Sequence, residues 1–144
     1  MPRRATEDDA DAIADVFLAA RADMTYLPEL HTEAETRTFI REIVLDRFET
    51  WISDDGLGFA ALSLDMLEHL YGHPTAQGSG LGSELLDLAK ERRPDGFRLW
   101  VFQKNEGARR FYERHGLLLV ELTDGAGNAE LEPDALYEWR GSPA

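Results

Sequence analysis

The spacing of apolar positions along the chain predicts four helices. In each of them, apolar residues recur three and four positions apart, as they do on the buried face of an amphipathic helix. Ile13, Val16 and Phe17 form such a stripe in the first predicted helix. The helices are expected to begin at Thr6 and Thr32, each at a capping-box pair, to run from Gly82 to near Arg93, and to run from Asn105 to Gly116.

Short apolar runs between these helices predict seven strands. Bulky residues favour extended structure in several of the runs, and the turn signal Asp54-Asp55-Gly56 separates two of them. The expected strands cover residues 2–5, 49–52, 57–64, 66–71, 97–102, 117–122 and 136–139.

The order of these elements, β-α-α-β-β-β-α-β-α-β-β, predicts a mixed α+β or α/β fold with one central sheet. Strands 66–71 and 97–102 are joined through a helix, so we expect them to lie parallel. A chain of 144 residues suits one domain with its own core, and we assign residues 1–144 to a single domain.

Composition narrows the classes of function. Hydrophobic residues make up 43% of the chain and charged residues 30%, which is typical of a soluble globular protein, and no apolar run approaches the ~20 residues that span a membrane. The N-terminus lacks the apolar segment of a signal peptide, so we expect a cytoplasmic protein with no membrane partner. Cysteine is absent, which excludes disulfides, thiolate metal sites and an acyl-cysteine intermediate, and no metal is expected.

The net charge of −13 argues against a nucleic-acid partner, which would reward a basic face. It favours cationic acceptors such as amines through long-range attraction, although solubility alone also explains it. A polyanionic ligand would need local cations, and six of them lie near the two motifs described below: Lys90, Arg92, Arg93, Lys104, Arg109 and Arg110.

Residues 67–89 combine a short strand, a glycine loop and the start of a helix. Gly78, Gly80 and Gly82 alternate in the loop. Glycines let the backbone approach a phosphate, and the first N–H groups of a helix have no partners within it, so the loop is a candidate pyrophosphate cradle. A tight turn that binds nothing is the alternative. The loop lacks the Gly-Lys-Ser/Thr of nucleoside-triphosphate loops, and Ser83 stands where a dinucleotide fingerprint needs its third glycine.

Two longer runs of residues share the pattern of one known family. The first is Tyr71-Gly72-His73-Pro74-Thr75-Ala76-Gln77-Gly78-Ser79-Gly80-Leu81-Gly82, in which a Gln begins the glycines after a strand. The second, over residues 105–117, reads Asn-Glu-Gly-Ala-Arg-Arg-Phe-Tyr-Glu-Arg-His-Gly-Leu. They resemble the acetyl-CoA-binding motif and a later helix of the GNAT superfamily of N-acetyltransferases. Residues 5–10 are also similar to the family's usual opening.

The resemblance implies the GNAT fold, a central mixed sheet of about seven strands flanked by four helices. Strands 66–71 and 97–102 would splay apart at one end, and the pantetheine arm of acetyl-CoA, the implied cosubstrate, would enter that gap. The residues implied to bind it are Leu70, Tyr71, Gly72, Gln77, Gly78, Ser79, Gly80, Leu81, Gly82, Ser83, Asn105, Ala108, Phe111 and Tyr112.

The resemblance also implies catalytic roles. Tyr112 occupies the Tyr of the family's Phe-Tyr pair, and a phenol with a reference pKa of about 10 can protonate a departing thiolate. By position alone, Tyr112 could equally be a core aromatic. The backbone N–H of Gly72 would polarise the thioester carbonyl. Asn105 would contact CoA, although a helix cap explains it as well.

The general base is left open between two residues. The position at which many family members carry a Glu aligns with Met66, which cannot act as a base. Glu68 lies two residues later, on the same side of a regular strand, whereas His69 would face the other side. His31, in the expected acceptor loop, could act directly or through water. Glu68 and His31 could also be ordinary surface residues, and Tyr26 is expected to join both in binding the acceptor.

These residues together predict an N-acetyltransferase, an acyltransferase that moves an acetyl group from acetyl-CoA to a primary amine by direct attack in a ternary complex. The amine could belong to a small molecule, a protein N-terminus or a lysine. A non-catalytic acetyl-CoA-binding or sensing module of the same fold is the alternative, favoured by Met66 and Gly72. A homodimer also stays open, because many GNAT proteins are dimers.

Overall fold

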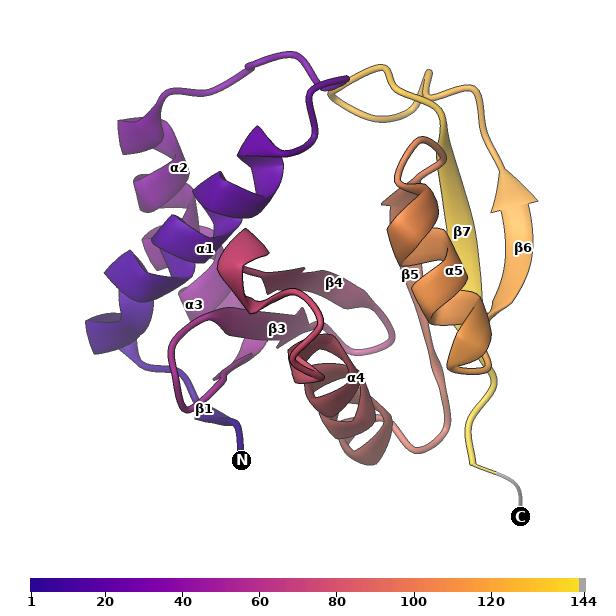
Figure 1. Ribbon diagram of the computed structural model, residues 1–144, viewed down its shortest axis with the longest axis horizontal. Helices are drawn as coiled ribbons and strands as arrows, with labels where there is room; N and C mark the ends of the chain where they lie inside the picture. Colours follow the sequence, from indigo (N-terminus) through magenta and orange to yellow (C-terminus); the bar gives the residue numbers. More distant parts are fainter. Residues whose placement is uncertain (143–144) are drawn as a thin grey trace.

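The computed structural model of the protein describes residues 1–142, and these contain the seven strands and four helices predicted from the sequence (Figure 1). One of the four helices consists of α2, η2 and α3, which follow one another without a break, and η2 is a π-helical turn. The elements are β1 (Arg3–Arg4), η1 (Glu7–Asp9), α1 (Ala10–Ala22), α2 (Glu33–Phe39), η2 (Ile40–Val44), α3 (Leu45–Arg47), β2 (Glu49–Ile52), β3 (Gly58–Leu62), β4 (Leu67–Gly72), η3 (Pro74–Ala76), α4 (Leu81–Arg92), β5 (Phe97–Phe102), α5 (Glu106–Arg114), β6 (Leu118–Leu122) and β7 (Asp134–Trp139).

The strands form two sheets where the sequence predicted one. The first has the order β1-β2-β3-β4 and the second β5-β7-β6, and all pairings inside them are antiparallel. A single parallel bridge between Met66 and Arg98 joins the sheets, supported by the Arg98 N–H, which donates to the Asp65 carbonyl at 3.0 Å. The expected parallel relation therefore exists only at this bridge, and β4 and β5 separate beyond it.

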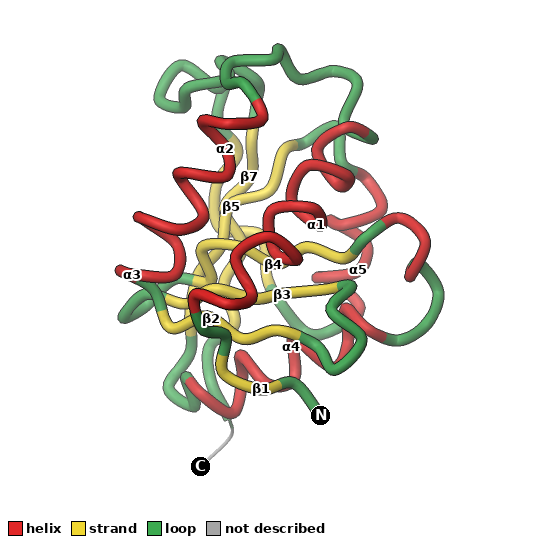
Figure 2. Tube along the Cα trace, turned by 90° about the vertical axis from the view of Figure 1, so that its left-hand side faces the viewer, coloured by secondary structure: helices red, strands yellow, loops and turns green. Residues whose placement is uncertain are grey.

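The first sheet has helices on both faces (Figures 1 and 2). Its strand β3 is buried throughout, so its side chains alternate between two cores. Phe59 and Ala61 belong to the core under α1, and Ala60 and Leu62 to the core under α4. The α1-side core consists of Ile13, Ala14, Val16, Ile40, Val44, Ile52, Phe59 and Ala61.

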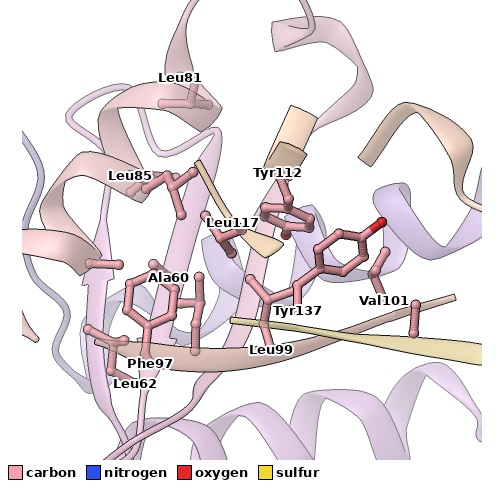
Figure 3. Close-up of a cluster of buried hydrophobic side chains, with 14 of the residues drawn as sticks. Ala60, Leu62, Leu81, Leu85, Phe97, Leu99, Val101, Tyr112, Leu117 and Tyr137 are labelled. Atoms are coloured by element: carbon pink, nitrogen blue, oxygen red, sulfur yellow. The ribbon is translucent and has the colours of Figure 1, made fainter. Parts of the chain in front are cut away.

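The α4-side core extends from the first sheet into the second and packs the two sheets together (Figure 3). Leu85 and Leu86 of α4 are fully buried, as are Leu117 and Tyr137 near α5 and in β7. Burying such a side chain contributes about 1.5–3 kcal/mol each. This shared core compensates for the single backbone bridge between the sheets.

Gly58 allows α4 to lie close against β3. A Cβ atom at this position would lie 2.7 Å from Cδ2 of Leu81 and 3.0 Å from Cδ1 of Leu85. A larger residue would therefore displace the start of α4 and the loop before it.

Strand β4 carries a bulge at Glu68. Leu62 pairs with Leu67 but the adjacent Ala61 pairs with His69, so Glu68 is the extra residue. The regular alternation that the sequence analysis used for this strand is interrupted there. Among the described residues, no helix is long and apolar enough to cross a membrane.

Candidate functional site

A cleft of about 990 Å³ opens where β4 and β5 separate. One end, here called the glycine-loop end, lies between the start of α4 and the helix α5. The other, the α1 end, is lined by Ala20, Asp23, Met24 and Tyr26 at and after the end of α1. The cleft thus collects segments that are far apart in the sequence (Figure 1).

The glycine loop presents free backbone donors to the cleft. Gly78 and Gly80 have φ angles of +82° and +83°, a left-handed conformation that favours glycine, and a Cβ on either would meet open space. Gly80 is the N-cap of α4 and offers no side-chain cap. The first bond of this helix start runs from the Glu84 N–H to the Gly80 carbonyl, so the N–H groups before it have no acceptor within the helix. Their orientation and the helix dipole suit an anion.

Most, but not all, of the other residues predicted in this loop line the cleft. Gln77 and Ser83 line the cleft, as do Leu81 and Gly82. Ser79 does not line it, because its hydroxyl turns back and donates to the Ala76 carbonyl at 2.6 Å. Ser79 therefore shapes the loop through its own backbone.

Helix α5 forms the opposite wall of the glycine-loop end. Asn105 caps it, since its Oδ1 accepts from the Ala108 N–H at 3.2 Å, and both residues line the cleft. Phe111 also lines it and limits the space at Gly82, where a Cβ would lie 3.3 Å from the ring. The predicted cofactor residues of the two motifs are thus brought to one place.

Tyr112 lies deep in the cleft, beside Leu117 and Tyr137 (Figure 3). Only 8% of the residue is exposed, and burial, with a smaller contribution from Tyr71, raises the pKa of its phenol. Its hydroxyl forms no hydrogen bond with the rest of the described chain. Tyr112 is therefore a protonated donor without a protein acceptor.

Strand β4 supplies the cleft wall between the two ends. Leu70 packs against the α4-side core, whereas Tyr71 packs edge-on against Phe17 of α1 with ring centroids 5.2 Å apart. Gly72 ends the strand, and a Cβ there would lie 3.9 Å from Leu81, an ordinary contact. Packing therefore does not require glycine at position 72.

Of the two candidate bases, the structure brings only Glu68 into the cleft. Glu68 is exposed, lines the cleft at the bulge and forms no ion pair with the described residues. His31 is exposed in the loop between α1 and α2 and is not among the lining residues. Tyr26 lines the α1 end, and its buried hydroxyl has no hydrogen-bond partner among the described residues.

His69, which the sequence analysis set aside, also lines the cleft. The ring packs among aromatic side chains, at 5.8 Å from Phe39 and 5.9 Å from Phe17 between centroids. Burial, together with the positive charge of Arg21, lowers its pKa to about 4. His69 is therefore neutral at neutral pH, and its buried Nδ1 has no partner in the described chain.

Two ion pairs close the α1 end. Arg21 pairs with Glu130 at 3.2 Å, and Lys104 pairs with Glu132 at the same distance. They connect the end of α1 and the segment after β5 to the loop between β6 and β7, which lies at the upper right in Figure 1. The cations at this end are thereby neutralised.

Four of the six cations expected near the ligand are bound elsewhere. Lys104 and Arg110 line the cleft. Lys90 donates to the His115 carbonyl, Arg92 and Arg93 pair with Glu49, and Arg109 donates to the Tyr137 hydroxyl.

Sequence reasoning missed several residues that line the cleft. Arg114 lies four positions after Arg110, which the sequence analysis named, so both fall on one face of α5, and this spacing could have revealed Arg114. Trp100 and Phe102 alternate on β5, but nothing in the sequence distinguishes a cleft-facing aromatic from a core one.

Comparison with known proteins agrees with this geometry. The sequence model of the acetyltransferase (GNAT) domain matches residues 45–116, which include the glycine loop and α5. No protein of curated function shows significant sequence similarity to the chain.

Solved structures of the same family have a similar architecture. The apo form of YjaB from Escherichia coli aligns over 99% of this chain and 98% of its own, with 20% identity and a TM-score of 0.77. A GCN5-related N-acetyltransferase from Rhodopseudomonas palustris aligns over 97% and 94%, with 21% identity and a TM-score of 0.75. A GNAT-family acetyltransferase from Bacillus cereus aligns over 99% and 98%, with 16% identity and a TM-score of 0.74.

At these identities the structural likeness shows the fold, and the match of the family model over half of the chain shows the family. Both agree with the glycine loop, the divergent strands and the seven-strand, four-helix architecture. The chain therefore belongs to the GNAT family of acetyltransferases, whose members use acetyl-CoA as cosubstrate.

Proposed function

We propose that this protein transfers the acetyl group of acetyl-CoA to a primary amine by direct attack in a ternary complex. The acceptor would be a small-molecule amine, a protein N-terminus or a lysine. The observation that carries the proposal is the meeting, in one cleft, of an uncapped glycine-loop helix start with the free hydroxyl of Tyr112.

The glycine-loop end fits the pyrophosphate of acetyl-CoA. Positive φ angles at Gly78 and Gly80 leave open space where side chains would stand, and the unpaired N–H groups at the start of α4 can donate to phosphate oxygens. Arg110 and Arg114 add positive charge from α5. Bound acetyl-CoA would supply a thioester as the acetyl donor.

Tyr112 is proposed as the general acid. Its raised pKa keeps the phenol protonated at neutral pH, and the absence of a protein acceptor leaves the proton available to the departing sulfur. The backbone N–H of Gly72, at the end of β4, is proposed to stabilise the negative charge that develops on the carbonyl oxygen.

Glu68 is proposed as the general base, with His31 as the second candidate. Glu68 lines the cleft and has no cation partner in the described chain, so its carboxylate is free to accept the amine proton, directly or through water. The nitrogen–carbon bond then forms as the carbon–sulfur bond breaks, and the sulfur takes the proton of Tyr112.

A CoA-binding or sensing module without catalysis is the second candidate function. Gly72 favours it, because a side chain would fit there without a clash and its absence loosens the strand end that would polarise the carbonyl. Met66, at the position where many relatives carry a Glu, favours it as well.

The test is calorimetric titration of acetyl-CoA into the wild type and the variant Gly80→Glu. The new side chain would occupy the open space at the loop and place a negative charge against the pyrophosphate, so we expect binding to weaken by at least about 100-fold. Gly56→Glu is the matched control, because Gly56 also has a positive φ, of +73°, and open space but lies in the turn between β2 and β3.

Acetyl-CoA binding by the wild type and the control, lost only in Gly80→Glu, would support the cosubstrate site. Release of CoA in the presence of an amine panel would then separate an enzyme from a sensing module. Failure of the folded wild type to bind acetyl-CoA would reject both candidate functions.

A further inference from the structure

His115 lies behind the glycine-loop end and is connected to the cleft through the side chain of Ser83. Ser83, in the first turn of α4, lines the cleft, and its Oγ lies 3.0 Å from Nε2 of His115. His115 is the C-cap of α5 and is not among the residues that line the cleft. Any effect of this imidazole on a bound ligand must therefore pass through the Ser83 hydroxyl.

The other ring nitrogen fixes the tautomer of His115. Its Nδ1 lies 2.8 Å from the carbonyl oxygen of Phe111. A carbonyl only accepts hydrogen bonds, so Nδ1 carries a proton. In the neutral imidazole Nε2 is then bare and accepts the proton of the Ser83 hydroxyl. Ser83 consequently presents only oxygen lone pairs to the cleft, which is unfavourable next to a phosphate.

Protonation of His115 reverses this arrangement. The new Nε2–H donates to the oxygen of Ser83, and the Ser83 O–H becomes free to donate into the cleft. We propose that His115 is a positioning residue that takes up one proton from solvent when the phosphates of acetyl-CoA bind, and so turns the Ser83 hydroxyl toward them. This inference rests on the proposed function.

Charges around His115 act in both directions. On α4, the Lys90 Nζ donates to the His115 carbonyl at 2.6 Å, and Asp87 lies one turn after Ser83 on the same helix face. On α5, Glu113 and Arg114 precede it. The two cations oppose protonation, whereas the carboxylates and the C-terminal end of the α5 dipole favour it. Bound phosphates add negative charge at Ser83 and shift the balance toward the imidazolium.

The test is calorimetric titration of dephospho-CoA at pH 6 and pH 8. This probe keeps the pyrophosphate but lacks the 3′-phosphate, whose own ionisation near pH 6 would obscure the result. The wild type should bind about three- to tenfold more weakly at pH 8, because binding that takes up a proton weakens as the proton concentration falls. Titration in two buffers of different ionisation enthalpy should show net proton uptake on binding near neutral pH.

Two variants separate this effect from a structural role. In His115→Gln an amide N–H can donate to Ser83 at every pH, so we expect equal affinity at pH 6 and pH 8, close to that of the wild type at pH 6. Ser83→Ala should also remove the pH dependence. It should bind more weakly than the wild type at pH 6 because the hydroxyl donor is lost, but it should still bind because the backbone donors remain. The other three histidines are present in every protein, so any pH dependence that they cause persists in both variants, and only the part lost in both is assigned to His115.

A wild-type pH profile that persists unchanged in both variants would overturn the inference and leave the cosubstrate site intact. So would tight binding without proton uptake. Failure of folded wild type to bind at either pH would reject the proposed function and this inference together. Circular dichroism of each variant controls for folding, and Ser83→Ala provides the test if His115→Gln does not fold.

Discussion

The two ends of the cleft are built in different ways. The glycine-loop end is made largely of backbone from one continuous segment, residues 77–83, and α5 forms its opposite wall. The α1 end is made of side chains from α1, the loop after it, the bulged β4 and the aromatic face of β5. A site built from backbone depends little on the identity of its side chains, whereas a site built from side chains depends on each of them.

The two ends of the cleft also differ in the charge of their unpaired side chains. At the glycine-loop end, Arg110 and Arg114 line the cleft and form no ion pair with described residues. At the α1 end, Arg21 and Lys104 are paired with carboxylates, and Glu68 is left without a cation. The cleft therefore offers positive charge where a polyanion would lie and negative charge where an amine would approach.

The largest expected effect comes from the residue between the two ends. Tyr112→Phe should lower kcat about 10³-fold, because the departing sulfur loses its proton donor, while the dissociation constant of acetyl-CoA changes less than about twofold. Tyr137→Phe is the control, since its hydroxyl donates to Glu113 at 2.6 Å, and its kcat should match the wild type. Steady-state kinetics that showed equal kcat for all three proteins would remove Tyr112 as the acid.

A smaller effect should distinguish the two candidate bases. Glu68→Gln should lower kcat about 100-fold through loss of the proton acceptor, whereas His31→Gln, which alters a residue outside the cleft lining, should cost less than about threefold. The measurement is the initial rate against amine concentration, from which kcat is obtained. Calorimetric titration of acetyl-CoA confirms that the glycine-loop end is intact. The opposite order of effects would make His31 the base and place the acceptor farther from β4.

The smallest expected effect concerns the stability of the α1 end. His69 has a pKa of about 4 in the folded protein and about 6.5 when unfolded, so between these values the unfolded state binds more protons. The contribution of His69 to the free energy of unfolding is complete above pH 6.5 and is lost as the pH falls toward 4. Relative to His69→Phe, the wild type should lose about 2 kcal/mol between pH 7 and pH 4.5, measured by urea unfolding. Parallel stability curves for the two proteins would mean that the imidazole is hydrated rather than buried.

The elements that form the glycine-loop end could be predicted from the sequence because their signals are local. Alternate glycines, a helix start and the Asn105 cap all act within a few residues, and the structure brings them together. The α1 end could not be predicted in the same way. The bulge at Glu68 depends on pairing with β3, and the place of His31 outside the cleft lining depends on how the irregular loop over residues 23–32 folds back. The environment of His69 needs Phe17 of α1, Phe39 of α2 and Phe59 of β3 to come together.

The split into two sheets could not be predicted from the sequence for a similar reason. Helical connection correctly predicted the direction of β4 relative to β5, but periodicity carries no information on how many residues of two strands pair. Only the bridge between Met66 and Arg98 forms. Beyond the bridge, the two sheets are held together by the core that they share, which includes Tyr112 and Leu117.

The short bridge between Met66 and Arg98 leaves β4 and β5 as facing sheet edges. Beyond it, the backbone N–H and C=O groups on these edges have no strand partner across the gap. An extended molecule lying between them would act as an added strand and protect them from solvent. Amide hydrogen exchange in β4 would then slow when the cleft is occupied, and the same edges would be less open to pairing with other chains during aggregation.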